Sequence, residues 1–229
     1  MTLNKDLLIE DVKKIPGLLV AFIIIGYGIA QTKALNFGMA PWDTLGLGIV
    51  NITGMEFGKI IQLIGLAVVI FSVMIKIYPG IGTILNMICI GFFVDLISKF
   101  NILISPDNYF LKIIVLFYAL TVQSYGLYSY LKYEIGAGPR DGLMVGLVQI
   151  TGLSVKYIKT GIEAIVLIAG FLLGGTVGLG TIIATLSGGF ILNKIFYLKN
   201  FDAKTTCQRK LSDYFVLKKC EEPIINNRG

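Results

Sequence analysis

The sequence predicts an all-α polytopic membrane protein made of two homologous repeats. The chain is 55% hydrophobic and 15% charged, whereas soluble domains carry about 25% charged residues. An offset of 98 residues (136 − 38 = 98) aligns the two halves without a gap. It places Gly38-Met39-Ala40-Pro41-Trp42-Asp43 over Gly136-Ala137-Gly138-Pro139-Arg140-Asp141. Roughly a third of the aligned positions are identical, as an old internal duplication would leave them.

Each repeat is expected to contain three spanning helices and one short helix that begins with proline. A spanning helix needs about 20 residues, and the long apolar segments meet or approach that length. In the first repeat, residues 17–98, the expected spans are 18–35, 59–78 and 81–97, and the short segment is 40–54. In the second repeat, residues 113–198, they are 113–131, 157–173 and 179–197, and the short segment is 138–152. Outside the repeats we expect a cytoplasmic N-terminal segment with a short interfacial helix, a connecting loop and a basic cytoplasmic tail (1–16, 99–112 and 199–229).

The short segments leave the topology open. About 14 residues reach roughly 21 Å as a helix, less than the ~30 Å hydrocarbon core, so these segments are either re-entrant or short tilted spans. If they do not cross, the halves are inverted with three spans each; if they cross, the halves are parallel with four. The loop charges fit both arrangements equally. Matching short segments in two halves favour the inverted form. The basic tail and the lysines before the first span place both termini in the cytoplasm.

The doubled motif is a helix start with a functional alternative. Pro41 and Pro139 fit the first helical position, where the missing N–H costs nothing. Asp43 and Asp141 then meet the free N–H groups and positive dipole of the first turn. The functional interpretation is that the two N-termini converge and, with Arg140, bind an anionic or zwitterionic solute. Trp42 stands in the place of Arg140 in the first copy, or serves as an interface-belt residue.

Glu163 is an ionisable residue inside an apolar segment, which makes it a functional candidate. Lys159 precedes it by four residues on the same helical face, and Arg140 is the alternative partner. The pair either holds helices in register or serves transport, with Glu163 carrying a coupling proton. The predicted substrate-binding residues are therefore the two motifs and this pair: Pro41, Trp42, Asp43, Pro139, Arg140, Asp141, Lys159 and Glu163. Other polar residues in apolar segments are interpreted as helix–helix hydrogen-bonding groups: Gln62, Asn86, Gln123 and Gln149.

The composition argues against other classes of function. The chain has no histidine, and its three cysteines lack metal or redox spacing, so we expect no enzyme activity, metal or cofactor. The excess positive charge lies at the termini and in membrane loops, which argues against nucleic-acid binding. The expected function is a small-solute transporter or channel with its path between the repeats. The alternative is a non-transporting accessory or sensor protein. Expected partners are the lipid bilayer, a small solute, and a second copy or a cytoplasmic partner bound through residues 199–229.

The linked motifs resemble the YczE-like family of bacterial membrane proteins, which is related to the YitT-like group. They comprise the motif at 136–142, Thr151-Gly152-Leu153-Ser154, Lys159 with Glu163, the glycine-rich 173–181, and Pro41-Trp42-Asp43 with Thr53-Gly54-Met55. The resemblance covers residues 17–198. It implies a multi-pass protein of the bacterial inner membrane and no particular activity. The family pattern tends to have arginine where this chain has Lys159, which weakens any role that needs a bidentate guanidinium.

Overall fold

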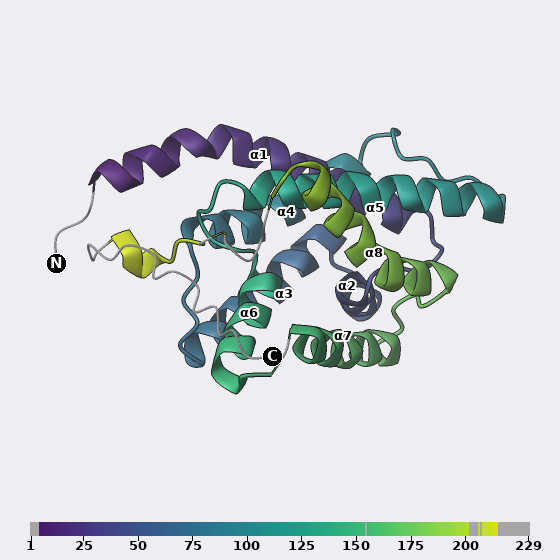
Figure 1. Ribbon diagram of the computed structural model, residues 1–229. Helices are drawn as coiled ribbons and strands as arrows, with labels where there is room; N and C mark the ends of the chain where they lie inside the picture. The colour runs from purple at the N-terminus through teal and green to yellow at the C-terminus, as the bar shows by residue number, and fades with distance from the viewer. Residues whose placement is uncertain (1–4, 154, 202–205, 207, 215–229) are drawn as a thin grey trace.

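The computed structural model describes residues 5–153, 155–201, 206 and 208–214, and this part of the chain is all-helical (Figure 1). The predicted all-α class is therefore confirmed. The four helices of the first half are α1 (Lys5–Ala34), α2 (Pro41–Thr53), α3 (Phe57–Met74) and α4 (Ile81–Ser98). Those that follow are α5 (Tyr109–Leu131), α6 (Pro139–Thr151), α7 (Val155–Leu172), α8 (Leu179–Leu198) and the short 3₁₀ helix η1 (Leu211–Tyr214).

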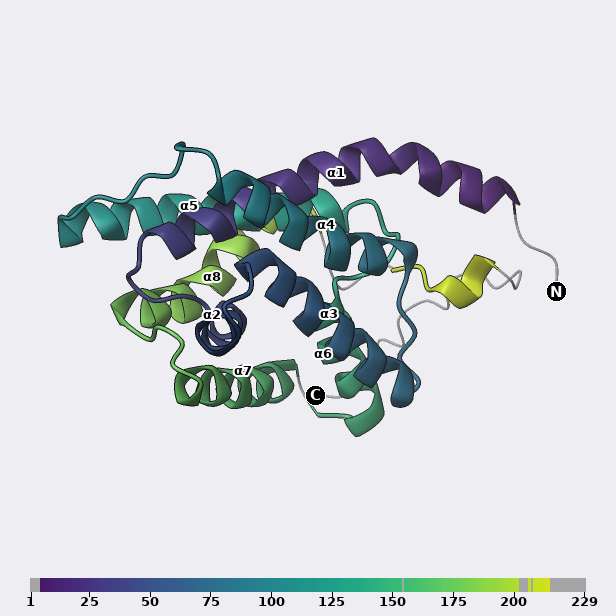
Figure 2. The same cartoon turned by 180° about the vertical axis from the view of Figure 1, so that it is seen from behind.

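Five helices pack in the order α3, α4, α1, α5 and α8, each in contact with the next. The largest buried cluster lies at these contacts and includes Leu18, Phe22, Val94 and Tyr130. The helix α7 packs instead on α2 and α6, and both views place it on the side of the molecule away from α1 (Figures 1 and 2).

Five helices in the described residues are long and apolar enough to cross a membrane: α1 from Asp6, α3, α4, α5 and α8. The sequence predicted six long spans. The sixth, α7, has the same length as α3, 18 residues. It differs from α3 in composition, because Lys156, Lys159 and Glu163 interrupt its apolar sequence.

Two helices begin at least four residues earlier than the sequence indicated. The structure continues α1 through Pro16 from Lys5, so residues 5–16 form part of the first long helix and not a separate interfacial helix. The loop after α4 is shorter than expected, and α5 begins at Tyr109. The side chain of Asn108 accepts hydrogen bonds from the N–H groups of Phe110 and Leu111, which is the standard stabilisation of a helix N-terminus.

The end of α1 and the start of α3, which flank α2 in the chain, lie at the same end of the bundle. Before α2, the carbonyl of Ala34 accepts a hydrogen bond from Ser105, in the loop between α4 and α5. After α2, the N–H groups of Gly58 and Lys59 donate to the carboxylate of Asp95 in the last turn of α4. The helix before α2 therefore ends, and the helix after it begins, near the C-terminal end of α4.

Candidate functional site

The first turns of α2 and α6 meet through their side chains. Arg140 Nη1 donates a hydrogen bond to Asp43 Oδ1 at 3.3 Å, and its guanidinium lies 5.1 Å from the ring centroid of Trp42. Asp43 is 2% exposed, whereas the Arg140 side chain is 29% exposed. The structure thus joins the two Pro-x-Asp motifs, and the residues at which the copies differ, Trp42 and Arg140, contact each other.

The loop before each short helix is held by the other half of the chain. The N–H of Gly180, at the start of α8, donates to the carbonyl of Phe37 at 2.9 Å. In the same way the N–H of Gly82, at the start of α4, donates to Ile135 at 2.7 Å. The hydroxyl of Thr83 also donates to the carbonyl of Ala137 at 2.5 Å. These crossed contacts set the positions from which Pro41 and Pro139 start their helices.

Two glycines allow this close approach. Gly38 and Gly136 have φ angles of +107° and +119°, a region that residues with a Cβ rarely adopt. A Cβ on Gly38 would lie 2.7 Å from Thr181 Oγ1, and one on Gly136 would lie 2.8 Å from Gly80 Cα. Each motif therefore begins with glycine for both conformational and steric reasons.

Lys159 and Glu163 form a separate, looser pair. Their Nζ and Oε1 atoms are 3.9 Å apart, and the side chains are 50% and 28% exposed. Asp141, which is half-buried, lies within electrostatic reach of Arg140, Lys159 and Glu163. Of the two partners considered for Glu163, the structure therefore pairs it with Lys159 and pairs Arg140 with Asp43. The charged residues alternate in sign in the order Asp43, Arg140, Asp141, Lys159 and Glu163.

Burial explains why Asp43 needs Arg140. A carboxylate removed from water without a partner is strongly unfavourable, and an opposite charge with a hydrogen bond offsets that cost. The contact is a single hydrogen bond, so part of the guanidinium is free of Asp43. Among the described residues, no three histidine, cysteine or acidic side chains lie close enough to hold a metal ion.

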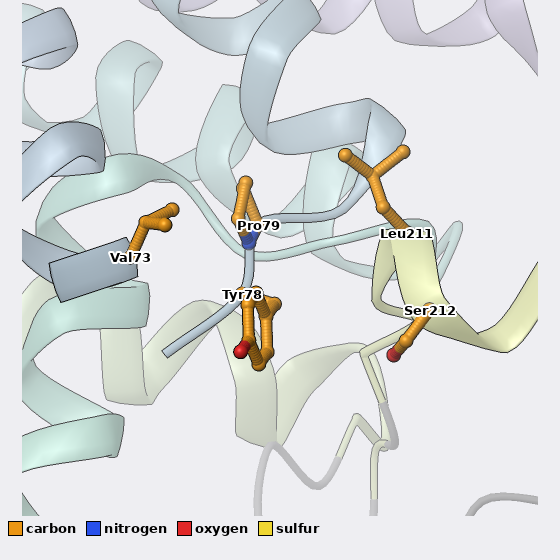
Figure 3. A pocket seen from close by; sticks show the side chains of 5 residues that line it. All are labelled: Val73, Tyr78, Pro79, Leu211 and Ser212. Atoms are coloured by element: carbon orange, nitrogen blue, oxygen red, sulfur yellow. The ribbon is translucent and has the colours of Figure 1, made fainter. Parts of the chain in front are cut away.

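A pocket in the described structure lies away from these charges (Figure 3). It is lined by Val73, Tyr78, Pro79, Leu211 and Ser212, where η1 meets the turn between α3 and α4. The carbonyl of Pro79 accepts a hydrogen bond from the N–H of Leu211 at 2.9 Å. The pocket is thus a product of tail docking.

The described part of the tail is held on the N-terminal end of α1. Asp11 is 2% exposed and accepts hydrogen bonds from Tyr214, Arg209 and Lys14. Burial, together with the hydrogen bond donated to Asp11, raises the pKa of Tyr214. Gln208 accepts a hydrogen bond from the N–H of Gly136 at 3.1 Å, so the tail reaches the second motif. Residues 202–205, 207 and 215–229 of the predicted basic tail lie outside the described structure.

Sequence reasoning did not find this docking. The signal in the sequence was the acidic pair Glu10 and Asp11 before the first apolar segment, because a carboxylate beside a membrane helix is unfavourable without a hydrogen-bonding or positively charged partner. The partners, however, are about 200 residues away along the chain.

Comparison with known proteins gives a family and no activity. A family described as "Family of unknown function (DUF6198)" matches residues 12–196. An uncharacterised protein of Haemophilus influenzae is 37% identical over 180 residues, covering 79% of this chain and 82% of that protein. The uncharacterised membrane protein YczE of Bacillus subtilis is 36% identical over 174 residues, covering 74% and 79%. No solved structure matches.

Proposed function

Because the chain belongs to the YczE-like membrane proteins, a family of unknown function, we propose a function from its own geometry. The protein is a carrier or channel for small zwitterionic or anionic solutes, and its path lies between two homologous repeats. The observation that carries this proposal is the junction of two helix N-termini through Arg140, Asp43 and Trp42.

Helix boundaries support the two repeats. In the described residues, α2 and α6 begin 98 residues apart, as do α3 and α7, and α4 and α8. Of the nine positive φ angles in the described residues, eight fall in pairs with the same offset, and Asn200 is the exception. Unrelated halves are not expected to share this pattern, because such angles are uncommon outside glycine. They occur in the pairs Asn36 and Glu134, Gly38 and Gly136, Gly54 and Gly152, and Lys76 and Gly174.

The course of α2 supports inverted repeats. A short helix does not cross the membrane when the helix before it ends, and the helix after it begins, at the same end of the bundle. With α2 and α6 both re-entrant, each half has three spans, and α7 is the sixth. The halves then have opposite orientations, and both termini lie on one side, which we assign to the cytoplasm of a bacterium because of the basic tail. Re-entrant helices that meet N-terminus to N-terminus are typical of transporter binding sites.

The charges of the site favour a solute with both signs. The N–H groups and dipoles of two helix starts attract an anionic group, and the part of the Arg140 guanidinium that is not bonded to Asp43 offers further N–H donors. Asp141 and Glu163 offer negative charge on the α7 side. Glu163, only loosely paired at 3.9 Å, is the group we assign to a coupled proton.

Transport in proteoliposomes tests the proposal. Uptake of labelled glycine, glycine betaine and acetate is measured with and without a pH gradient. We expect Arg140→Ala to abolish uptake, and Glu163→Gln to abolish its dependence on the gradient. The matched controls are Gln149→Ala, an exposed position on α6, and Glu56→Gln, an exposed acid. If Arg140→Ala transports as well as the original chain, or if no probe enters, the proposed function is wrong.

The docked tail favours a second candidate function. Gln208 and Arg209 bind the loop before α6, so a cytoplasmic protein that binds the tail would act on the second motif. In this view the chain is a non-transporting accessory or sensor protein. A chain that ends after residue 200 distinguishes the two functions. Uptake that persists without the tail supports the carrier, whereas loss of function with an intact, solute-binding bundle supports the accessory protein.

A further inference from the structure

The polar face of the site extends to a residue outside the two motifs. Asn86 lies on α4, one turn after Thr83, whose hydroxyl donates to Ala137. From there it reaches the start of α6. The point where a Cβ on Gly138 would stand is 3.4 Å from Asn86 Nδ2 and 3.5 Å from Asp141 Oδ2. An amide and a carboxylate therefore flank the space above Gly138.

The Asn86 side chain is half-buried, and its amide makes no hydrogen bond within the part of the chain that the structure describes. By contrast, Gln62 on α3 donates to the carbonyl of Ile88 at 2.7 Å, as expected for a helix–helix hydrogen bond. An unpaired amide between membrane helices is unfavourable. The prediction that these amides form helix–helix hydrogen bonds therefore fits Gln62 and does not fit Asn86.

Gly138 has no conformational reason to be glycine. Its φ and ψ angles are −56° and 159°, which any residue adopts. Ala40, at the same place before α2, has −59° and 155°. The residue of the second repeat that corresponds to Asn86 is Ala184, and Ala184 packs with Ala40 in an apolar cluster. Where α4 meets the start of α6, both of these alanines are replaced, one by the amide of Asn86 and the other by Gly138, which has no side chain.

We propose that Asn86, Asp141 and the space above Gly138 form the subsite for the ammonium group of a zwitterionic solute. This rests on the proposed function and deepens it. The anionic end of the solute lies toward Arg140. The ammonium N–H groups donate to the Asn86 amide oxygen and the Asp141 carboxylate, and the missing side chain of Gly138 leaves room for them.

Trp42 provides the assay, because it is the single tryptophan of the chain and contacts Arg140. Its fluorescence is titrated in detergent with glycine, glycine betaine and acetate. Glycine has ammonium N–H donors, glycine betaine has none, and acetate lacks the cationic end. We expect the original chain to bind glycine most tightly. Asn86→Ala and Gly138→Ala should each weaken glycine binding about three- to tenfold and change acetate binding less than about twofold.

The second half of the experiment separates this inference from the proposed function. The matched controls are Gln62→Ala, which removes an amide already bound to the backbone, and Ala40→Gly, the reverse exchange in the other half. Both should leave the preference for glycine unchanged. Gly138→Ala places a methyl group that the other half already accommodates, so it is expected to fold, and a melting curve verifies this.

If Arg140→Ala abolishes binding but Asn86→Ala and Gly138→Ala retain the preference for glycine, the subsite is wrong and the proposed function stands. If no probe produces a saturable change in the original chain, both are wrong.

Discussion

Removing the Arg140 side chain should destabilise the protein, because it leaves Asp43 buried without a partner. Breaking a buried ion pair from one side costs about 3–5 kcal/mol. The Arg140 side chain is 29% exposed and makes one hydrogen bond of 3.3 Å to Asp43. We therefore expect the lower end, about 3 kcal/mol for Arg140→Ala. At about 2–4 °C per kcal/mol for a chain of this size, the midpoint of unfolding falls by roughly 6–12 °C.

The double variant Arg140→Ala with Asp43→Asn carries no charge at the junction and should recover about 2 kcal/mol of that loss. Thermal unfolding in detergent, followed by helical circular dichroism, measures each variant. Lys159→Ala is the matched control, because its ion pair with Glu163 is looser, at 3.9 Å with side chains 50% and 28% exposed, and it should destabilise by less than about 1 kcal/mol. If Arg140→Ala and the double variant unfold within about 1 °C of each other, the ion pair does not stabilise the junction and the reasoning fails.

Three further predictions concern packing and the tail. Gly58→Ala should destabilise the protein by roughly 1–3 kcal/mol, because the added Cβ would lie 1.9 Å from a backbone oxygen of α4. The control is Gly161→Ala, whose Cβ would meet open space. It should be neutral or stabilising in the same melting experiment. Asp11→Ala removes the charge-assisted hydrogen bonds that hold the tail, so trypsin should cleave at Arg209 at least about tenfold faster. The raised pKa of Tyr214 means that its contribution to docking is present below its ordinary pKa of 10.0 and is lost as the pH rises above it. Cleavage should therefore accelerate only above about pH 10, and Tyr214→Phe should remove that acceleration.

Local chemistry made the short helices predictable. Proline sets the start of α2 and α6, and Gly54 and Gly152, both with a φ of +69°, end them in the left-handed conformation. The expected segments 40–54 and 138–152 differ from the observed helices by one residue at each end. Helix ends that depend on distant contacts were not predictable in this way. The first turns of α1 are the example, since their partners Arg209 and Tyr214 are in the tail.

The sequence indicated which residues to consider for the candidate site, but not which of their side chains contact each other. The difference between the two motif copies drew attention to Arg140 and Trp42, and the structure places these two side chains in contact. Pattern alone could not choose among the acids that Arg140 might contact, because its partner Asp43 is 97 residues away. Asn86 was interpreted as a packing residue, since nothing in an apolar helix distinguishes an amide bound to a neighbouring helix from one without a partner.

The buried carboxylate of Asp11 has a consequence for biosynthesis. Asp11 leaves the ribosome about 200 residues before Arg209 and Tyr214. Until these two residues have been made, Lys14 is the one of its three hydrogen-bond donors that is present. The contact around Asp11 can therefore form only after residues 209–214 have been released, and a product truncated before them would lack it.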